Sequence, residues 1–231
     1  MASSPKKIRR KDIRKPDQFV TLTGKILHLA SEYRTQSIVC LALLLTVLLG
    51  LWGWDSYRQR QNRLAAVEYA HALSLYRSGQ YSQAVDRFAQ VKNYSSSVYS
   101  RLALLYQANS YVALQDSAKA GAALQELLRK ESKDGFVRQL GLLSLASLQE
   151  RSNRCKEAGG NYAEAEKIAG PFKDEALLGK ARCNFQNGDF KEALSSYRQY
   201  QTNYPGSERS SEISLRIPEI EEKIAAENGA K

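Results

Sequence analysis

Residues 188–197 read GDFKEALSSY, and residues 79–88 read GQYSQAVDRF. Each stretch begins with glycine and has an aromatic residue at its third position, alanine at its sixth and an aromatic ring at its tenth. Glycine permits the turn between two helices, and a small residue lets the paired helices approach closely. The same helix–turn–helix pattern at two distant places in the chain predicts a repeat protein.

Two weaker copies lie between these stretches, and aligning all four places the unit starts near residues 65, 101, 139 and 174. The middle copies carry Gln115 and Asn153 where the outer copies have the turn glycine. Alanine nevertheless recurs at two equivalent positions of every unit, where a larger side chain would separate the paired helices. These positions are Ala72, Ala108, Ala146 and Ala181 on the first helices, and Ala84, Ala120, Ala158 and Ala193 on the second helices.

This pattern resembles the tetratricopeptide repeat, a helix–turn–helix unit of about 34 residues. The resemblance implies an all-α solenoid of about four stacked hairpins with a C-terminal capping helix. We expect the cap to consist of two helices, over residues 207–216 and 218–226, because Ser207 suits an N-cap and Pro218 suits a first helical turn. The alternative is a plain helical bundle without repeat order.

Twenty consecutive residues, Thr35 to Trp54, carry no charge. A helix of that length rises about 30 Å, which matches the hydrocarbon core of a bilayer. Trp52, Trp54 and Tyr57 cluster at its end, where aromatic rings favour the membrane interface. We predict one N-terminal transmembrane helix; a buried core helix and a cleaved signal peptide are the alternatives, and the long leader favours a retained anchor.

The net charge of +10 is unevenly distributed along the chain. Nine basic and three acidic residues precede Asp55, whereas the much longer remainder has a nearly balanced charge. An excess of Lys and Arg before a membrane span predicts that this side faces the cytoplasm. The basic character is therefore interpreted as a topology signal, and no nucleic-acid partner is expected.

The predicted organisation has five parts. They are a basic cytoplasmic leader with an amphipathic helix (1–34), a transmembrane helix (35–54), a linker helix (55–64), the repeat domain with its cap (65–226) and a disordered tail (227–231). The amphipathic helix is inferred from apolar residues that recur every three or four positions between Phe19 and Tyr33.

No arrangement of residues in the sequence predicts an enzyme. His28 and His71 fall on opposite sides of the membrane in this topology, so they cannot share a metal. The sequence contains neither a phosphate-binding glycine loop nor a nucleophile elbow. We expect no cofactor, no metal site and no small-molecule substrate.

The three cysteines differ in their expected environments. Cys40 lies inside the predicted span, where it acts as a small apolar residue. Cys155 opens the second helix of unit three, and Cys183 lies on the first helix of unit four. A disulfide between neighbouring repeats and a pair of separate buried thiols are both open interpretations, because a sequence does not supply the Cα separation that a bridge requires.

The first helices of stacked hairpins usually form a concave binding groove. The candidate groove residues are Tyr69, Leu73 and Tyr76 in unit one, Leu102, Leu105, Asn109 and Val112 in unit two, and Leu140, Leu143, Leu178, Arg182 and Phe185 in units three and four. They predict an apolar, aromatic groove with little charge, which suits an amphipathic peptide or a partly folded client.

Within this set, the aromatic residues Tyr69, Tyr76 and Phe185 are expected to be exposed. The leucines either contact a client or pack between repeats or beneath the C-terminal helix, and both interpretations stay open. Some tetratricopeptide domains hold a C-terminal carboxylate with lysine and asparagine in this groove. The lack of a lysine beside Asn109 argues against such a clamp.

The layout of the whole chain resembles the ancillary SecYEG translocon subunit (YfgM-type) family. The resemblance implies a single-pass bacterial inner-membrane protein with a cytoplasmic N-terminus and a periplasmic repeat domain. Its implied partners are proteins: the translocon, periplasmic chaperones or exported clients. We therefore expect a membrane-anchored scaffold that assists secretion or folding of exported proteins. The alternative is a cell-envelope organiser or assembly factor, in cytochrome maturation or division, that acts by self-association or partner recruitment.

Overall fold

The computed structural model describes residues 33–131 and 135–229, and these residues contain helices without strands. The predicted amphipathic helix before Tyr33 and the last two residues of the predicted tail lie outside them. The chain divides into two units, Met1–Tyr57 and Arg58–Lys231. The helices are α2 (Arg34–Arg77), α3 (Tyr81–Val91), α4 (Val98–Ala113), α5 (Ser117–Lys130), α6 (Phe136–Arg151), α7 (Cys155–Lys167), α8 (Lys173–Gln186), α9 (Phe190–Asn203) and α10 (Ser210–Gly229).

Helix α2 covers the predicted span, the linker and the first helix of unit one without interruption. Its large apolar side chains from Ile38 to Trp54 are exposed. The hydroxyl of Thr46 donates to the carbonyls of Ala42 and Leu43, so this polar group is satisfied within the helix. Among the described residues, α2 is the one helix long and apolar enough to cross a membrane.

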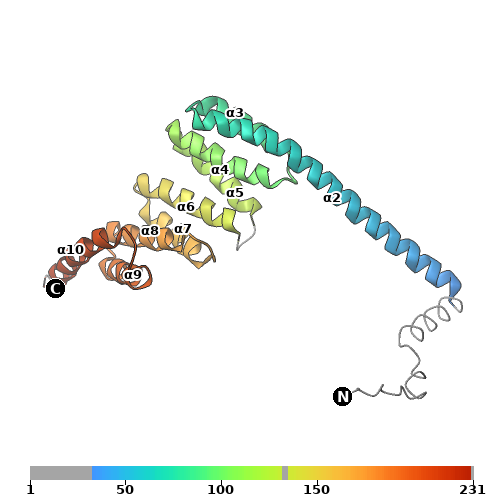
Figure 1. Cartoon of the computed structure of the whole chain (residues 1–231). Coiled ribbons are helices and arrows are strands. Elements are labelled where there is room, and N and C mark those ends of the chain that lie inside the picture. Colours follow the sequence, from blue (N-terminus) through green and yellow to red (C-terminus); the bar gives the residue numbers. More distant parts are fainter. Residues whose placement is uncertain (1–32, 132–134, 230–231) are drawn as a thin grey trace, which may run out of the picture. The chain divides into compact units, whose positions relative to one another are not determined.

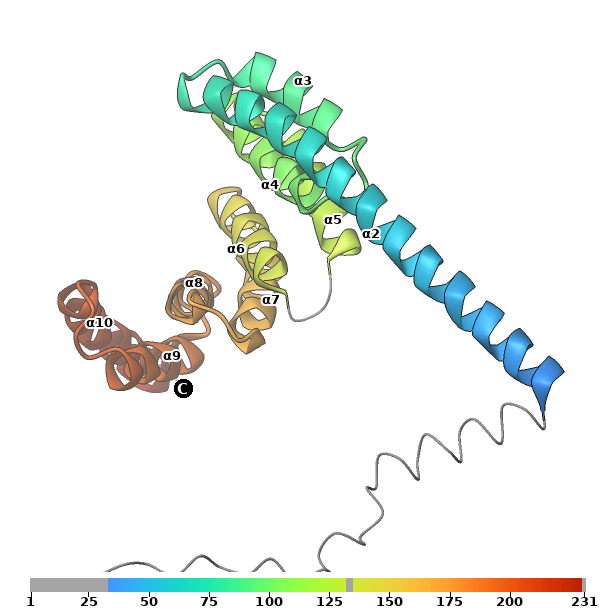
Figure 2. The same ribbon diagram turned by 45° about the vertical axis from the view of Figure 1, so that its right-hand side comes forward.

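From Arg58 onward the helices form four successive hairpins and a final helix (Figures 1 and 2). The hairpins are the C-terminal part of α2 with α3, α4 with α5, α6 with α7, and α8 with α9, followed by α10. Helices α4, α6 and α8 begin at Val98, Phe136 and Lys173, within three residues of the predicted unit starts. The predicted all-α solenoid is confirmed.

The eight repeated alanines lie where the paired helices approach most closely. All eight have no solvent-exposed area, although they come from eight different helix segments. Larger buried side chains then fill the space beside each alanine contact. Examples are Phe88 in the first hairpin, Leu124 in the second, Tyr162 in the third and Tyr200 in the fourth. The core is therefore a row of equivalent hairpin contacts, as in other helical solenoids.

The turns inside the four hairpins share one backbone conformation. Gly79, Gln115, Asn153 and Gly188 have φ angles of 77°, 62°, 57° and 83°. In each turn the N–H of this residue bonds to the carbonyl three positions earlier, and the next N–H bonds to the carbonyl five positions before it. This is the hydrogen-bond pattern of a helix C-terminus that ends on a left-handed residue. Gln115 and Asn153 thus adopt the left-handed conformation that glycine adopts in the other two turns, at some cost in backbone strain.

The predicted C-terminal capping helix is present, but the break expected before Pro218 is absent. One helix, α10, runs through Pro218, so the prediction of two separate helices is wrong. Ile213 and Ile220 lie seven residues apart on one face of α10, and both are buried in the core of the fourth hairpin. The burial of both side chains offsets the loss of the hydrogen bond that proline cannot donate. Ser207 lies before α10, where its hydroxyl accepts from the N–H of Arg209.

Replacing Gln115 with glycine should raise the free energy of unfolding by about 1 kcal/mol, because it relieves a left-handed conformation that costs other residues about 1–2 kcal/mol. Asn153→Gly should gain less, because asparagine tolerates this conformation. Gly188→Ala should lower the free energy of unfolding by about 1 kcal/mol. A Cβ there would have no heavy atom within 4 Å, so this loss comes from the backbone conformation and not from a steric clash. Urea denaturation of the three variants measures each change. A loss of stability in Gln115→Gly would contradict the assignment.

Enlarging an interhelical alanine should destabilise the repeat domain. Ala120→Leu should lower the free energy of unfolding by about 1–3 kcal/mol, because the added atoms force the two helices of the second hairpin apart. Ala118 lies on the same helix but is exposed, so Ala118→Leu is the matched control and should change stability by less than about 0.5 kcal/mol. Equal effects in the two variants would show that the alanine contact does not set the helix separation.

Candidate functional site

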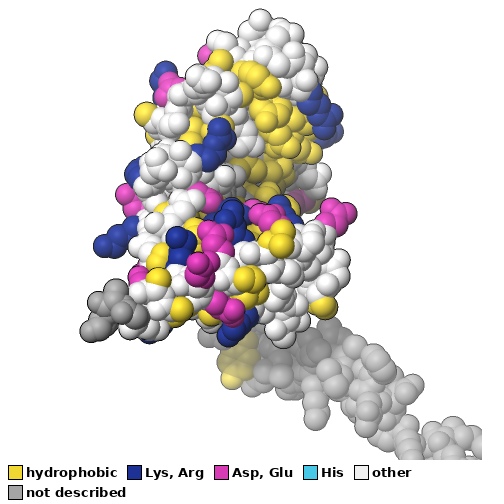
Figure 3. Space-filling view, turned by 90° about the vertical axis from the view of Figure 1, so that its left-hand side faces the viewer, with side chains coloured by type: hydrophobic (Ala, Val, Ile, Leu, Met, Phe, Trp, Pro, Cys, Tyr) yellow, Lys and Arg dark blue, Asp and Glu magenta, His cyan; other side chains and the backbone are white. Residues whose placement is uncertain are grey.

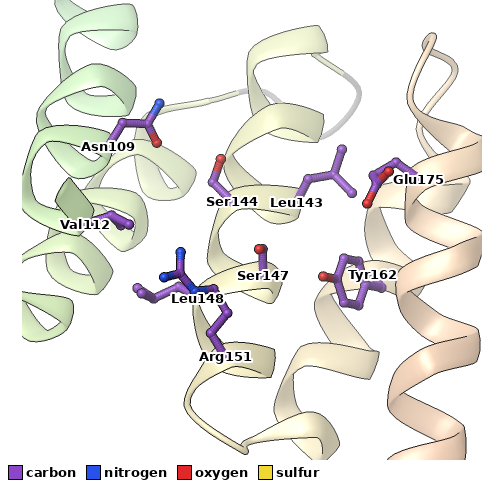
Figure 4. Close-up of a pocket in the computed structure, with 9 residues that line it drawn as sticks. All are labelled: Asn109, Val112, Leu143, Ser144, Ser147, Leu148, Arg151, Tyr162 and Glu175. Atoms are coloured by element: carbon purple, nitrogen blue, oxygen red, sulfur yellow. The ribbon is translucent and has the colours of Figure 1, made fainter. Parts of the chain in front are cut away.

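The first helices of the repeats enclose a hollow of about 330 Å³ over α4, α6 and α8 (Figure 4). Its lining residues are Asn109, Val112, Leu143, Ser144, Ser147, Leu148, Arg151, Tyr162 and Glu175. Helix α6 contacts both α4 and α8, so it forms the middle of this surface. The hollow therefore occupies the groove face that the repeat pattern predicts.

Helix α6 supplies most of the polar groups in the hollow. Ser144, Ser147 and Arg151 recur at intervals of three and four residues, which places them on one side of the helix. The guanidinium of Arg151 lies between α4 and α6 in Figure 4, on the side of Asn109. The side chains that line the hollow without a partner are Asn109, Ser144, Ser147 and Arg151. None of them makes a hydrogen bond or ion pair with any residue in the described parts of the chain. The hollow thus has free hydrogen-bonding groups above an apolar floor.

An aromatic cluster occupies the groove face at the first hairpin. The ring of Tyr106 on α4 lies 5.9 Å from Tyr69 and 5.4 Å from Tyr76, and it stacks on Phe88 at 5.8 Å. Tyr69 also contacts Tyr99 at 5.3 Å between ring centroids. Burial raises the pKa of the Tyr69 hydroxyl, with a further contribution from Tyr106. Mutual packing holds the rings of the cluster in place, and the Tyr69 hydroxyl stays neutral at physiological pH.

An ionic network joins α6, α7 and α8 at the other side of the hollow. Arg182 donates two hydrogen bonds to the carboxylate of Glu150, at 2.8 and 3.0 Å, and the Tyr162 hydroxyl donates a third at 2.7 Å. Glu175 pairs with Arg209 at 2.6 Å and lies 3.9 Å from Arg182. In Figure 3, Lys, Arg, Asp and Glu side chains gather below a continuous hydrophobic area.

The network changes the titration of its members. Partial burial opposes ionisation of Glu150, but the hydrogen bonds from Arg182 and Tyr162 outweigh it and lower the pKa of this carboxyl below its usual range. Burial raises the pKa of Tyr162, and its hydrogen bond to Glu150 raises it further. Tyr162 reaches Glu150 because Gly179 on α8 leaves room for its ring, where a Cβ would collide with the ring.

The capping helix covers the groove at the fourth hairpin. Phe185 on α8 contacts the ring of Phe190 at 5.5 Å. The cations of Arg216 and Lys223, both on α10, each lie 5.9 Å from the centre of the Phe185 ring. A smaller hollow of about 210 Å³ remains there, between α8, α9 and the start of α10.

Comparison with known proteins agrees with this architecture. The family model described as "Tetratricopeptide repeat-like domain" matches residues 30–168, and a second model, "Tetratricopeptide repeat", matches residues 143–208. The chain belongs to the tetratricopeptide repeat-like family. No curated protein sequence matches it. As a tetratricopeptide repeat protein, it has the fold of a protein–protein interaction scaffold.

Solved structures that are similar to this chain have low sequence identity to it. A putative kinesin light chain of Podosopora anserina with TPR-like repeats is 16% identical, with a TM-score of 0.55 over 71% of this chain and 93% of that one. PilW, a type IV pilus biogenesis factor, is 21% identical, with a TM-score of 0.50 over 62% and 64%. PilF of Pseudomonas aeruginosa is 19% identical, with a TM-score of 0.49 over 66% of each chain.

The structure brings together part of the predicted groove set. Asn109, Val112 and Leu143 line the larger hollow, and Leu178, Arg182 and Phe185 line the smaller one. Leu73 lines a third, shallow surface with Ala70, Ser74, Arg77 and Ser78. Leu105, Leu143 and Leu178 are buried between repeats, whereas Leu102 and Leu140 are half-buried.

Two expectations about the groove are wrong. Tyr69, Tyr76 and Phe185 are half-buried rather than exposed, because rings of the next repeat and cations of the cap cover them. The groove also carries more charge than expected, because Glu150 and Arg182 meet across α6 and α8.

The tetratricopeptide fold also brings Cys155 and Cys183 together. Cys155 is the first residue of α7, Cys183 lies on α8, and both are buried with their sulfur atoms 2.6 Å apart. The two residues come from neighbouring repeats, as their register indicates.

Sequence reasoning missed several groove residues. Ser144 lies in the middle of α6, directly after Leu143, and Ser147 and Arg151 follow it towards the C-terminal end of the helix. Their spacing of three and four residues from one another was a usable signal. Tyr106 and Glu150 carried no such signal, because their roles depend on partners in adjacent helices.

The Glu150 network predicts a specific pH dependence. The folded-state pKa of Glu150 is lowered, so the stability that its charge contributes is present above its ordinary pKa and is lost as the pH falls through the folded value. Glu150→Gln should cost about 1–2 kcal/mol at pH 7, and the difference from wild type should shrink below about pH 4. Urea denaturation at pH 7, 5 and 3.5 measures it, with the exposed Glu222→Gln as control. A pH-independent difference would contradict the role of the charge.

Proposed function

We propose that this protein is a membrane-anchored scaffold whose groove binds amphipathic polypeptide segments, which come from exported proteins or from proteins that assist them. The observation that supports this most directly is the hollow over α4, α6 and α8, which combines an apolar floor with free polar groups. Ser147 and Arg151 are exposed and pair with no described residue, so a bound partner can form hydrogen bonds with them without breaking contacts within the domain.

The chemistry of the hollow indicates the kind of segment that fits. Val112, Leu143 and Leu148 provide apolar contact area, and Arg151 provides a cation without a partner among the described residues. Arginine binds carboxylates through paired, charge-assisted hydrogen bonds. An amphipathic segment that carries apolar side chains and one carboxylate therefore complements the surface, and it binds through a helix-in-groove or extended mode.

The apolar part of α2 supports a membrane anchor, and the excess of basic residues before it supports a cytoplasmic N-terminus. The repeat domain then acts in the periplasm of a bacterial cell, beside the secretion channel, as the resemblance to ancillary translocon subunits implies. Anchoring increases the local concentration of a weak binding site near its partners. A scaffold that assists secretion or folding needs only modest groove affinity under these conditions.

A photocrosslinking amino acid placed at Ser147 or Asn109 should capture translocon subunits, periplasmic chaperones or newly exported chains, as identified by mass spectrometry. The matched control is Gln125, which is exposed on the second helix of the repeat and away from the hollow. Adducts from all three positions in equal amounts would contradict a specific groove. Adducts that contain only this protein would favour the envelope organiser that acts by self-association.

Charge reversal at one position tests the predicted carboxylate. Arg151→Glu should reduce the adducts from Ser147 about tenfold, because it replaces an attractive contact with a repulsive one. Arg129→Glu changes the net charge equally on the exposed face of α5 and should leave the adducts unchanged. Similar losses in both variants would mean that the overall charge of the domain matters and that Arg151 has no specific role.

A further inference from the structure

Two buried cysteines meet at the junction between the third and fourth repeats. Cys155 begins α7 and is 4% exposed, and Cys183 lies on α8 and has no exposed area. Their sulfur atoms are in contact, 2.6 Å apart. The two helices pack closely here. A Cβ added to Gly159 of α7 would lie 4.0 Å from the Cβ of Cys183. The backbone of both repeats holds the two side chains in this contact.

We propose that Cys155 and Cys183 form an intramolecular disulfide that ties the third repeat to the fourth; this rests on the proposed function for its oxidising compartment. The oxidant is a disulfide donor, such as an oxidised thiol–disulfide oxidoreductase. One cysteine thiolate attacks the donor disulfide, and the second then attacks the mixed disulfide. The two cysteines lose two electrons and two protons, the donor takes them up, and its disulfide leaves as two thiols.

The contact also indicates when the bond forms. Burial raises the pKa of the Cys183 thiol, and the neighbouring Cys155 raises it further. The reactive thiolate is therefore scarce once α7 and α8 have packed. Exchange takes place while the segments are still accessible, and the packed helices then shield the bond from reductants. Such a bond is structural and does not serve as a reversible switch.

The bond would hold the wall of the groove in place. Cys155 begins α7, the helix that carries Tyr162, and a short turn joins α7 to the end of α6, where Glu150 lies. Cys183 directly follows Arg182 on α8. Fixing α7 against α8 therefore keeps Arg182 within hydrogen-bond distance of Glu150 and Tyr162 within reach of the same carboxylate. The disulfide and the ionic network stabilise the same junction by independent means.

Alkylation of the full chain tests the bond in cells. Membranes are quenched in acid, and denatured protein is treated with a maleimide polymer with or without prior reduction. The wild type should gain one polymer, on Cys40, before reduction and three after it. Cys155→Ser should gain two under both conditions. Three polymers on the unreduced wild type would overturn the proposal for an exported domain.

A second measurement separates the disulfide from the proposed location. Ser95, which is exposed, is changed to Cys in a chain whose own cysteines are serine, and intact spheroplasts are labelled with an impermeant maleimide. Labelling supports export, so free Cys155 and Cys183 would then overturn the disulfide and leave the scaffold function standing. If Ser95→Cys is not labelled, the proposed location is wrong. Refolding in vitro then tests whether Cys155 and Cys183 form a disulfide.

In that refolding arm, the full chain in detergent is refolded with oxidised and reduced glutathione. Peptide mapping should find Cys155 linked to Cys183, and adding reductant should lower the melting temperature by roughly 5–10 °C. The Cys155→Ser/Cys183→Ser double variant should be insensitive to reductant. Mixed glutathione adducts without an internal bond would overturn the proposal in any compartment.

Discussion

The close approach of two helices across a methyl group is the constraint on which the repeat domain depends. Eight alanines in equivalent places have no exposed area, so each hairpin has the same helix separation. The turn that follows each first helix also has the same left-handed residue and the same two hydrogen bonds. With separation and turn both fixed, the second helix of every unit takes the same position, and the first helices of successive units face the same side. The groove is a consequence of these two repeated contacts.

The groove face has three regions, which differ in whether their side chains already contact other residues of the chain. At the first hairpin, aromatic rings pack on one another around Tyr106. At the third and fourth hairpins, Glu150 and Arg182 satisfy each other, and α10 covers Phe185. A partner that bound at either end would have to replace contacts that already exist. The middle has hydrogen-bonding capacity on Ser147 and Arg151 that the described residues do not use, and binding there adds contacts without breaking any.

The repeat architecture could be predicted because each unit repeats the same local requirement. Ala120 and Ala158 keep the alanine pattern where the turn glycine is missing, so the register survives Gln115 and Asn153. The cap could not be predicted in the same way. Pro218 is a strong local signal for a helix start, but the burial of Ile213 and Ile220 against the fourth hairpin overrides it. That contact exists only in the folded domain.

The groove side chains were harder to predict than the fold, because their surroundings come from different repeats. Tyr69 looks like an exposed aromatic residue until Tyr106 and Tyr99 of the next unit are placed against it. Arg182 looks like an available cation until Glu150, on the preceding first helix, accepts two of its hydrogen bonds. Composition and periodicity describe one helix at a time. They do not report which side chain of the neighbouring helix lies opposite.

The contrast between two arginines shows why the middle of the groove is the better binding surface. Arg182 and Arg151 both lie towards the C-terminal ends of first helices, in successive units. Glu150 precedes Arg151 by one residue, which places the two side chains about 100° apart around α6, and Glu150 therefore points to Arg182. Among the described residues, a carboxylate pairs with Arg182 and none pairs with Arg151. Arg151 is therefore available to a carboxylate of a partner, and the apolar floor beside it favours a polypeptide over a free ion.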